Sequence, residues 1–189
     1  MSEVINNRSP LQGVSPLFYE RWSPRAFDSG EIDEATLSRL IDAARWSPSC
    51  MNEQPWLIYT STKNTFNDYL GLLMETNQVW AKTASVIGFM VGRKQFEKNG
   101  KDNPFQAFDC GAAWMAMTLQ ARHEGLYTHG MGGIKREAIV EYLDLNGDSQ
   151  AVLMGFTIGR LGDPKQLSEE MRAIEKPSQR KALDQIWFR

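Results

Sequence analysis

The sequence has few of the residues that build disulfide scaffolds or metal centres. Its 189 residues include two cysteines and two histidines. Cys50 and Cys110 allow at most one bridge, which excludes a disulfide scaffold and fits a reducing, cytoplasmic compartment. Neither His123 nor His129 has cysteine or histidine neighbours at metal-ligand spacing, so no metal site is predicted.

Long apolar runs and an excess of one charge are also missing. The longest apolar stretches, near residues 84–91 and 110–119, are shorter than the roughly 20 residues that span a bilayer. No apolar stretch typical of a secretory signal follows the start of the chain. Lys and Arg number 21 and Asp and Glu 23, a net charge of −2, without the basic excess of a general nucleic-acid binder. We therefore expect a cytoplasmic protein that binds neither membranes nor nucleic acids.

What the sequence does contain is typical of one folded domain. The hydrophobic fraction is 42% and the charged fraction 23%, both ordinary for globular proteins. No internal repeat, low-complexity tract or linker divides the chain, so we predict a single domain over residues 1–189. Within it, residues 1–14 form a loose lead-in and residues 161–189 a C-terminal arm.

Hydrophobic periodicity predicts helices that alternate with short strands. Asp33 is a plausible N-cap for one of the helices, and Gly125 is a plausible C′ residue after another. The charged residues 93–103 are expected to be a solvated excursion. An α+β fold follows, with a sheet layered by helices. The expected helices are 15–20, 33–46, 66–77, 108–124 and 136–143, and the expected strands 56–62, 85–92, 127–131 and 151–159.

Two apolar features point to a second subunit. The predicted helix 108–124 is apolar around most of its circumference, which fits either a dimer interface or an ordinary central core helix. The polar arm 161–189 ends in Ile186, Trp187 and Phe188, an apolar patch that a partner subunit would cover.

Three segments carry residues suited to binding a phosphorylated, planar ligand. Arg21 and Arg25, with Ser23 between them, could bind one phosphate, although an ordinary surface loop would look the same. Gly132 and Gly133 stand before a predicted helix and would let the backbone approach a ligand, or would simply form a flexible turn. The pair Arg180 and Lys181 could add to the phosphate site or be solvated.

The third segment is the loop 47–56, SPSCMNEQPW. Its amides, Asn52 and Gln54, suit the edge of a heterocycle such as an isoalloxazine, but they could equally satisfy the backbone of their own turn. Cys50 could be a nucleophile, yet no base is evident beside it in the sequence.

Together these segments resemble the flavin-dependent nitroreductase family. The resemblance rests on RWSPRAF, then SPSCMNEQPW, NQVWAKTASVIGFMV, DCGAAWMAMTLQARHEGL, MGGI and LMGFTIGR, in the order the family shows them. It implies an α+β homodimer with a central mixed or antiparallel sheet flanked by helices. It also implies two FMN molecules at the subunit interface and a C-terminal arm exchanged with the partner.

The resemblance also implies which residues hold the FMN. The first segment would hold its phosphate and ribityl chain, the 49–54 loop would border the ring, Asn77 would lie at the pyrimidine edge, and the late turn would lie near the hydride-accepting nitrogen. Trp80 and Gly132 depart from some members, which carry a basic residue and a Glu there. The implied cofactor-binding residues are Arg21, Trp22, Ser23, Arg25, Ser49, Cys50, Met51, Asn52, Gln54, Asn77, Gly132, Gly133, Arg180 and Lys181.

The chemistry implied is that of an FMN-dependent oxidoreductase. NADH or NADPH would donate hydride in ping-pong turnover, and a small electron-poor acceptor such as a nitroaromatic, quinone or enone would be reduced. The cofactor carries the chemistry, so no catalytic side chain is assigned. Two alternatives stay open: another flavin reaction on this scaffold, such as dehydrogenation or dehalogenation, and a non-enzymatic flavin-binding or storage protein.

Overall fold

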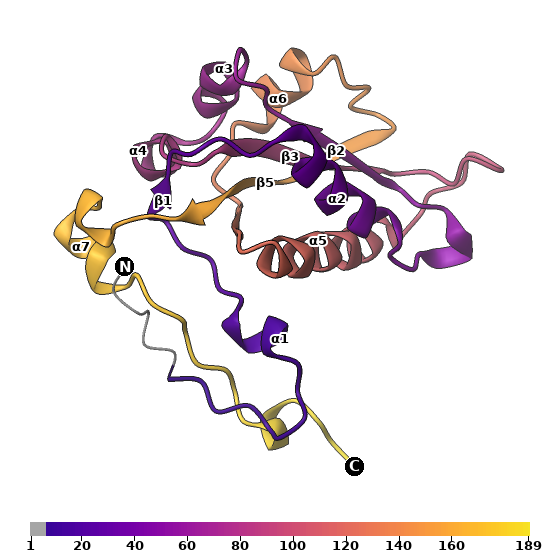
Figure 1. Cartoon of the computed structure of the whole chain (residues 1–189). Helices are drawn as coiled ribbons and strands as arrows, with labels where there is room; N and C mark the ends of the chain where they lie inside the picture. The colour runs from indigo at the N-terminus through magenta and orange to yellow at the C-terminus, as the bar shows by residue number, and fades with distance from the viewer. Residues whose placement is uncertain (1–6) are drawn as a thin grey trace.

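The computed structural model describes residues 7–189, so the first six residues of the predicted lead-in lie outside the described range. The elements appear in Figure 1. Among the described residues, no helix is long and apolar enough to cross a membrane. The helices are α1 (Pro16–Glu20), α2 (Glu34–Arg45), α3 (Phe66–Gly71), α4 (Glu75–Ala81), α5 (Gln106–His123), α6 (Arg136–Tyr142) and α7 (Glu169–Ala173). The strands are β1 (Phe27–Asp28), β2 (Trp56–Thr60), β3 (Val86–Arg93), β4 (Tyr127–Met131) and β5 (Gln150–Leu161).

The strands form one antiparallel sheet, in the order β1-β5-β3-β2, with β4 also paired to β5. The 12-residue β5 is therefore the strand on which most of the sheet is built. Gly88 lies opposite Phe156 in the register of β3 and β5, and a Cβ on Gly88 would lie 2.3 Å from that ring. The predicted α+β class, with an antiparallel sheet flanked by helices, is confirmed.

Apolar side chains pack on both faces of the sheet. One cluster joins the sheet to α3, α4 and α6, with Phe89 and Leu73 fully buried in it. The other joins it to α2 and α5 through Leu40, Met117 and Phe156. Figure 1 shows the same layers, with α5 below the sheet and α3 and α6 above it. Each face buries its own apolar cluster, which is the usual way that helices stabilise a sheet.

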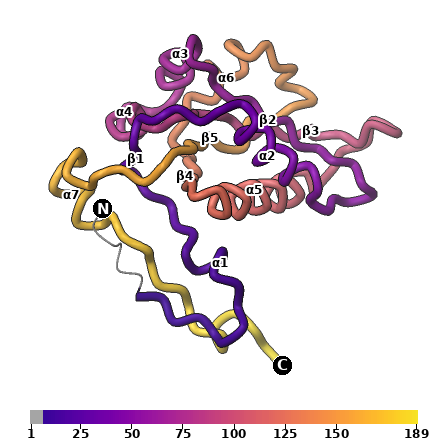
Figure 2. Tube along the Cα trace, in the orientation of Figure 1, coloured from indigo at the N-terminus to yellow at the C-terminus, as the bar shows by residue number. Residues whose placement is uncertain are grey.

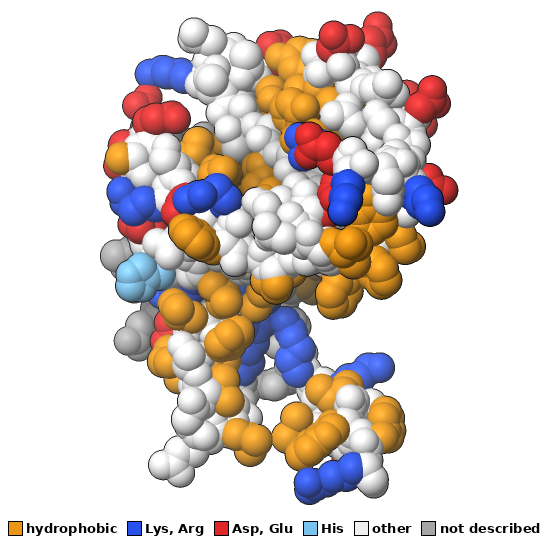
Figure 3. Space-filling model, turned by 90° about the vertical axis from the view of Figure 1, so that its right-hand side faces the viewer, with side chains coloured by type: hydrophobic (Ala, Val, Ile, Leu, Met, Phe, Trp, Pro, Cys, Tyr) orange, Lys and Arg blue, Asp and Glu red, His pale blue; other side chains and the backbone are white. Residues whose placement is uncertain are grey.

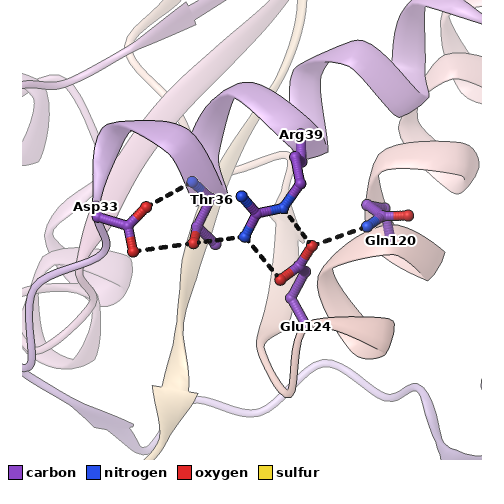
Figure 4. Close-up of polar contacts among 5 residues, drawn as sticks. All are labelled: Asp33, Thr36, Arg39, Gln120 and Glu124. Carbon is purple, nitrogen blue, oxygen red and sulfur yellow. Dashed lines mark hydrogen bonds and ion pairs between the residues drawn. The ribbon is translucent and has the colours of Figure 1, made fainter.

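A polar network fixes α2 against the end of α5 (Figure 4). Asp33 caps α2 by accepting from the Thr36 amide at 2.7 Å, as the sequence predicts. Arg39 makes a bidentate pair with Glu124 at 2.7 and 3.0 Å, and Gln120 donates to the same carboxylate at 3.0 Å. The Arg39 hydrogen bond is the main reason that the pKa of Glu124 falls to about 2.

The structure corrects the predicted helix 66–77. It divides into α3 and α4, because the backbone at 72–74 pairs with the turn before α6 instead of with itself. Leu73 forms an antiparallel bridge with Ile134, the Met74 amide donates to the Gly133 carbonyl at 3.0 Å, and the Lys135 amide donates to the Leu72 carbonyl at 2.9 Å. The strand β1, with only two residues, and the short helix α7 also have no counterpart in the sequence prediction.

The two ends of the chain leave the body together. Figures 1 and 2 show the segment before β1 and the segment after α7 running side by side away from the sheet. Trp187 and Phe188 are 57% and 80% exposed at the end of this arm. On the body, Phe108 of α5 is 79% exposed although the opposite face of the helix is buried. Both apolar features flagged in the sequence are therefore uncovered in the single chain.

Candidate functional site

The loop between α1 and β1 carries the first group of predicted residues, and two side chains from elsewhere hold it. Glu175, in the C-terminal segment, accepts from the amides of Arg25 and Ala26 at 2.7 and 2.8 Å. The guanidinium of Arg21 lies 3.5 Å from the hydroxyl of Ser23. These contacts fix the backbone of the loop.

Trp22 points away from this group. Its ring is 5% exposed and lies edge-on to Tyr127 of β4, with centroids 6.2 Å apart. The indole therefore anchors the loop in the core.

His129 of β4 holds the loop from the other side. Its ring lies 4.6 Å from that of Trp80, and its Nδ1 lies 2.9 Å from the Pro24 carbonyl oxygen. Because a carbonyl only accepts, Nδ1 carries the proton. Burial is the main cause that lowers the pKa of His129 to about 4, with smaller contributions from Arg25 and Arg21, so the imidazole is neutral at pH 7. Sequence reasoning examined this histidine only as a metal ligand.

Three arginines from distant parts of the chain gather beside the loop. Burial lowers the pKa of Arg21, and the charges of Arg8 and Arg180 lower it further. Arg8 donates to the Arg21 carbonyl at 2.6 Å and to the Ser178 carbonyl at 2.8 Å, next to Arg180. Lys181, the last predicted cation, follows Arg180 and is exposed. In Figure 3, Lys and Arg side chains lie in the hollow between the body and the arm. Arg8 was missed because nothing in the local sequence sets it apart.

Asn77 and the glycine turn, predicted to share one site, do lie together. The Asn77 side-chain amide donates to the Gly133 carbonyl at 3.0 Å. A Cβ on Gly133 would lie 2.6 Å from Asn77 Nδ2, so glycine leaves room for this contact. A Cβ on Gly132 would meet nothing within 4 Å, which leaves open space in front of this residue.

The 49–54 loop is a tight turn whose backbone is set by its own polar groups and by α5. Met51, Asn52 and Gln54 have φ of 54°, 57° and 51°, in the left-handed region. The Gln54 amide donates to Ser49 Oγ at 2.9 Å, and the Gln54 side chain donates to the Asn52 carbonyl at 3.0 Å. The side chains of Gln54 and Ser49 thus take part in shaping the turn, and Met51 is 79% exposed at its surface.

Asp109, in the first turn of α5, ties this loop to the body. It is 3% exposed and accepts from the Cys50 amide at 3.0 Å. Its neighbour Cys110 is buried, and burial followed by the Asp109 charge raises the pKa of that thiol to about 12. Among residues 7–189, no group of three His, Cys, Asp or Glu residues could hold a metal.

The two groups of predicted residues lie at opposite ends of α5. The 49–54 loop contacts Asp109 at the start of the helix, whereas Glu20, next to Arg21, pairs with Arg122 at its end across 3.7 Å. Thirteen residues at 1.5 Å per residue separate these contacts by about 20 Å. Within the described chain, the structure therefore joins the arginine cluster to the Asn77 turn through His129 and Trp80, but it does not bring in the 49–54 loop.

Comparison with known proteins adds an independent line of evidence. A family model described as the nitroreductase family matches residues 19–81 and 68–160. A solved structure described as an oxidoreductase containing FMN is 40% identical, covers 97% of this chain and 95% of its own, and superposes with a TM-score of 0.92.

Two more distant relatives agree. An FMN complex from Exiguobacterium sibiricum, provisionally described as a nitroreductase, is 21% identical, with a TM-score of 0.74 over 91% of this chain and 94% of its own, a likeness of fold. A curated Streptomyces coelicolor protein provisionally named NADH dehydrogenase/NAD(P)H nitroreductase is 27% identical over 93 residues. That match covers 49% of this chain and 46% of the relative, so this chain spans about half the length of the curated relative.

Proposed function

Because the chain belongs to the nitroreductase family, we propose that it is an FMN-dependent oxidoreductase. It takes electrons from NADH or NADPH and reduces small electron-poor acceptors such as nitroaromatics, quinones and enones. The observation that carries the proposal is the arginine cluster joined, through the half-buried His129, to the turn formed by Asn77 and Gly133. One end of that assembly suits a phosphate and the other the edge of a planar ring.

The residues present fit FMN. Burial lowers the pKa of Arg8 and of Arg21, and the neighbouring arginine charges lower both further, so a phosphate dianion there would relieve the repulsion. Asn77 offers an amide edge, and open space in front of Gly132 leaves room for a ring beside the backbone.

A homodimer completes the site in this proposal. The arginine cluster and the 49–54 loop of one chain contact opposite ends of α5, about 20 Å apart, so in this proposal they do not border the same flavin. A two-fold related copy, packed along the exposed face of α5, would place its 49–54 loop beside the first copy's arginines. The exposed Phe108 and the apolar end of the arm supply the surface that such a contact buries. The arm then embraces the partner.

The chain's own residues bind and orient in this mechanism. FMN held by Arg21, Arg180 and Asn77 would supply hydride transfer from the nicotinamide to the acceptor, and the two would bind in turn in ping-pong fashion. The backbone amides at Gly132 and Gly133 would stabilise negative charge at the edge of the ring, and Arg25 would add positive charge at the phosphate end. No side chain has to act as an acid or base for hydride transfer.

The test uses the purified full-length chain. We expect a yellow protein whose flavin absorbance bleaches when NADH or NADPH is added without oxygen, and recovers when a quinone or nitroaromatic is added. If protein refolded with excess FMN shows neither a shifted flavin spectrum nor quenched fluorescence, the proposal is wrong. Bound flavin that no nicotinamide reduces would favour a storage protein, and flavin reduced only by an organic substrate would favour a dehydrogenase.

A further inference from the structure

Arg8 connects three segments that are far apart in the sequence. Its Nε donates to the Ser178 carbonyl at 2.8 Å, and its Nη1 donates to the carbonyls of Tyr19 and Arg21 at 3.0 and 2.6 Å. Beside it, Gln179 donates to the Asn7 carbonyl at 2.7 Å, which extends the same junction. The N-terminal segment, the end of α1 and the C-terminal arm therefore meet at one guanidinium, where the two chain ends run side by side in Figure 2.

This junction determines where two other positive charges lie. Arg21 is covalently next to the α1 end that Arg8 holds, and Arg180 follows two residues after Ser178, which Arg8 also holds. The guanidinium of Arg180 bonds within its own segment, to the carbonyl and hydroxyl of Ser178 and the carbonyl of Gln179. Arg180 is therefore fixed to the arm, and the Arg8 bond to Ser178 is what joins that part of the arm to Arg21.

Three guanidinium groups close together favour an anion among them. Burial lowers the pKa of Arg8 and of Arg21; the charge of Arg180 lowers both further, and that of Arg8 also lowers the pKa of Arg21, so like charges repel here. A phosphate ester with two negative charges would turn this repulsion into charge-assisted hydrogen bonds.

We propose that Arg8 is a positioning residue for the flavin phosphate, and that it sets the preference for FMN over riboflavin. The inference rests on the proposed function and goes beyond it, because it assigns the choice between two flavins to the N-terminal segment. By holding the arm against the end of α1, Arg8 makes Arg21 and Arg180 face one anion and adds its own charge. The ring end of the site depends on another contact, that of Asn77 with Gly133, so Arg8 acts on the phosphate alone.

A lysine cannot replace Arg8 in this role. The planar guanidinium reaches carbonyls in two directions from one rigid fork, whereas an ammonium is a point charge on a flexible stem. Arg8→Lys therefore keeps the charge but loosens the junction, and Arg8→Ala removes both.

The experiment titrates flavin-free full-length protein with FMN and, separately, with riboflavin, following the quenching of flavin fluorescence. Arg8→Ala should weaken FMN binding by about 10- to 100-fold and riboflavin binding by less than about twofold, since charge-assisted hydrogen bonds are lost only toward the phosphate. Arg8→Lys should weaken FMN binding by about 3- to 10-fold. Lys63→Ala is the control, because it removes one exposed positive charge paired with Glu31 and should change neither affinity.

Raised salt separates the electrostatic role from a general loss of structure. Salt should weaken FMN binding to the wild type more than to Arg8→Ala, because one charge facing the phosphate is gone in the variant. If Arg8→Ala loses affinity for FMN and for riboflavin equally, the inference is overturned, because Arg8 then supports the fold and not the phosphate site. If Arg8→Ala fails to fold, Arg8→Lys decides: unchanged FMN affinity overturns the inference, and a loss confined to FMN supports it. A wild type that binds neither flavin contradicts the proposed function itself.

Discussion

His129 donates its Nδ1–H to the carbonyl oxygen of Pro24 across 2.9 Å, which ties strand β4 to the loop that carries Arg21 and Arg25. The imidazole that makes this contact is neutral, because burial opposes a charge on the ring. It gives the protein a pH dependence that can be measured without any ligand.

The pKa of His129 is lowered from 6.5 to about 4 in the folded chain. Between these values the unfolded chain binds more protons than the folded chain, so the free energy of unfolding rises with pH across this window and is flat above it. The free energy of unfolding should rise by about 3 kcal/mol between pH 4 and 6.5. Urea unfolding measured at several pH values should lose this rise in His129→Gln and keep it in the exposed His123→Gln. The same pH dependence in His129→Gln and the wild type would contradict the burial argument.

Arg25 tests the phosphate end of the flavin site. Arg25→Ala should weaken FMN binding by about 1.5–3 kcal/mol, the scale of a hydrogen bond to a charged group. The Glu175 carboxylate bonds to the Arg25 and Ala26 amides, not to the guanidinium, so the loop should keep its shape. Calorimetry on the flavin-free protein gives the affinity, with unchanged thermal unfolding as the control. If Arg25→Ala binds FMN as tightly as the wild type, Arg25 does not contact the flavin.

The glycine turn offers a matched pair of substitutions. Gly133→Ala places a Cβ 2.6 Å from Asn77 Nδ2, so the Asn77 bond to the Gly133 carbonyl should break, at a cost of about 1 kcal/mol in stability. The Cβ added by Gly132→Ala has no atom within 4 Å, so without flavin this variant should be as stable as the wild type. With FMN, Gly132→Ala should bind more weakly if the ring lies against this residue. Chemical denaturation with and without FMN measures both effects, and equal stability of the two variants would refute the packing argument.

Cys50 is predicted to be dispensable for chemistry. Hydride transfer between nicotinamide and flavin needs no protein nucleophile, and the Asp109 contact in this loop is to the Cys50 amide, not to the thiol. Cys50→Ser should keep both flavin half-reactions within about tenfold in stopped-flow measurements, or roughly 1.4 kcal/mol of barrier. A thousandfold loss with FMN still bound would show that the thiol takes part in the reaction.

Assembly can be tested through α5. Phe108 is 79% exposed in the single chain, and in the proposed dimer it is buried against the second copy. Phe108→Asp should shift the light-scattering mass from a dimer toward the 21.5 kDa monomer and should weaken FMN binding in parallel. Asn64→Asp, which adds the same charge at an exposed turn, should do neither. A wild type that scatters only as a monomer at micromolar concentration would refute the dimer.

The sequence by itself determined the local elements whose residues interact with near neighbours. Asp33 caps the helix that it precedes, Gly125 has the left-handed φ of 75° that ends α5, and the apolar run 85–92 becomes the buried strand β3. Periodicity and capping depend on contacts between residues a few positions apart, so they can be predicted from the order of the residues alone. The order of the motifs also determined the family, because their spacing follows from one fold.

Only the tertiary structure decided the features that depend on contacts between distant residues. The break between α3 and α4 exists because residues 72–74 pair with 133–135, some 60 residues away, and backbone pairing there replaces the helical bonds that periodicity predicted. Arg8 reaches Ser178 across 170 positions, and His129 reaches Pro24 across 105. No local pattern signals such contacts, since their free energy comes from packing and charge that arise only when the chain is folded.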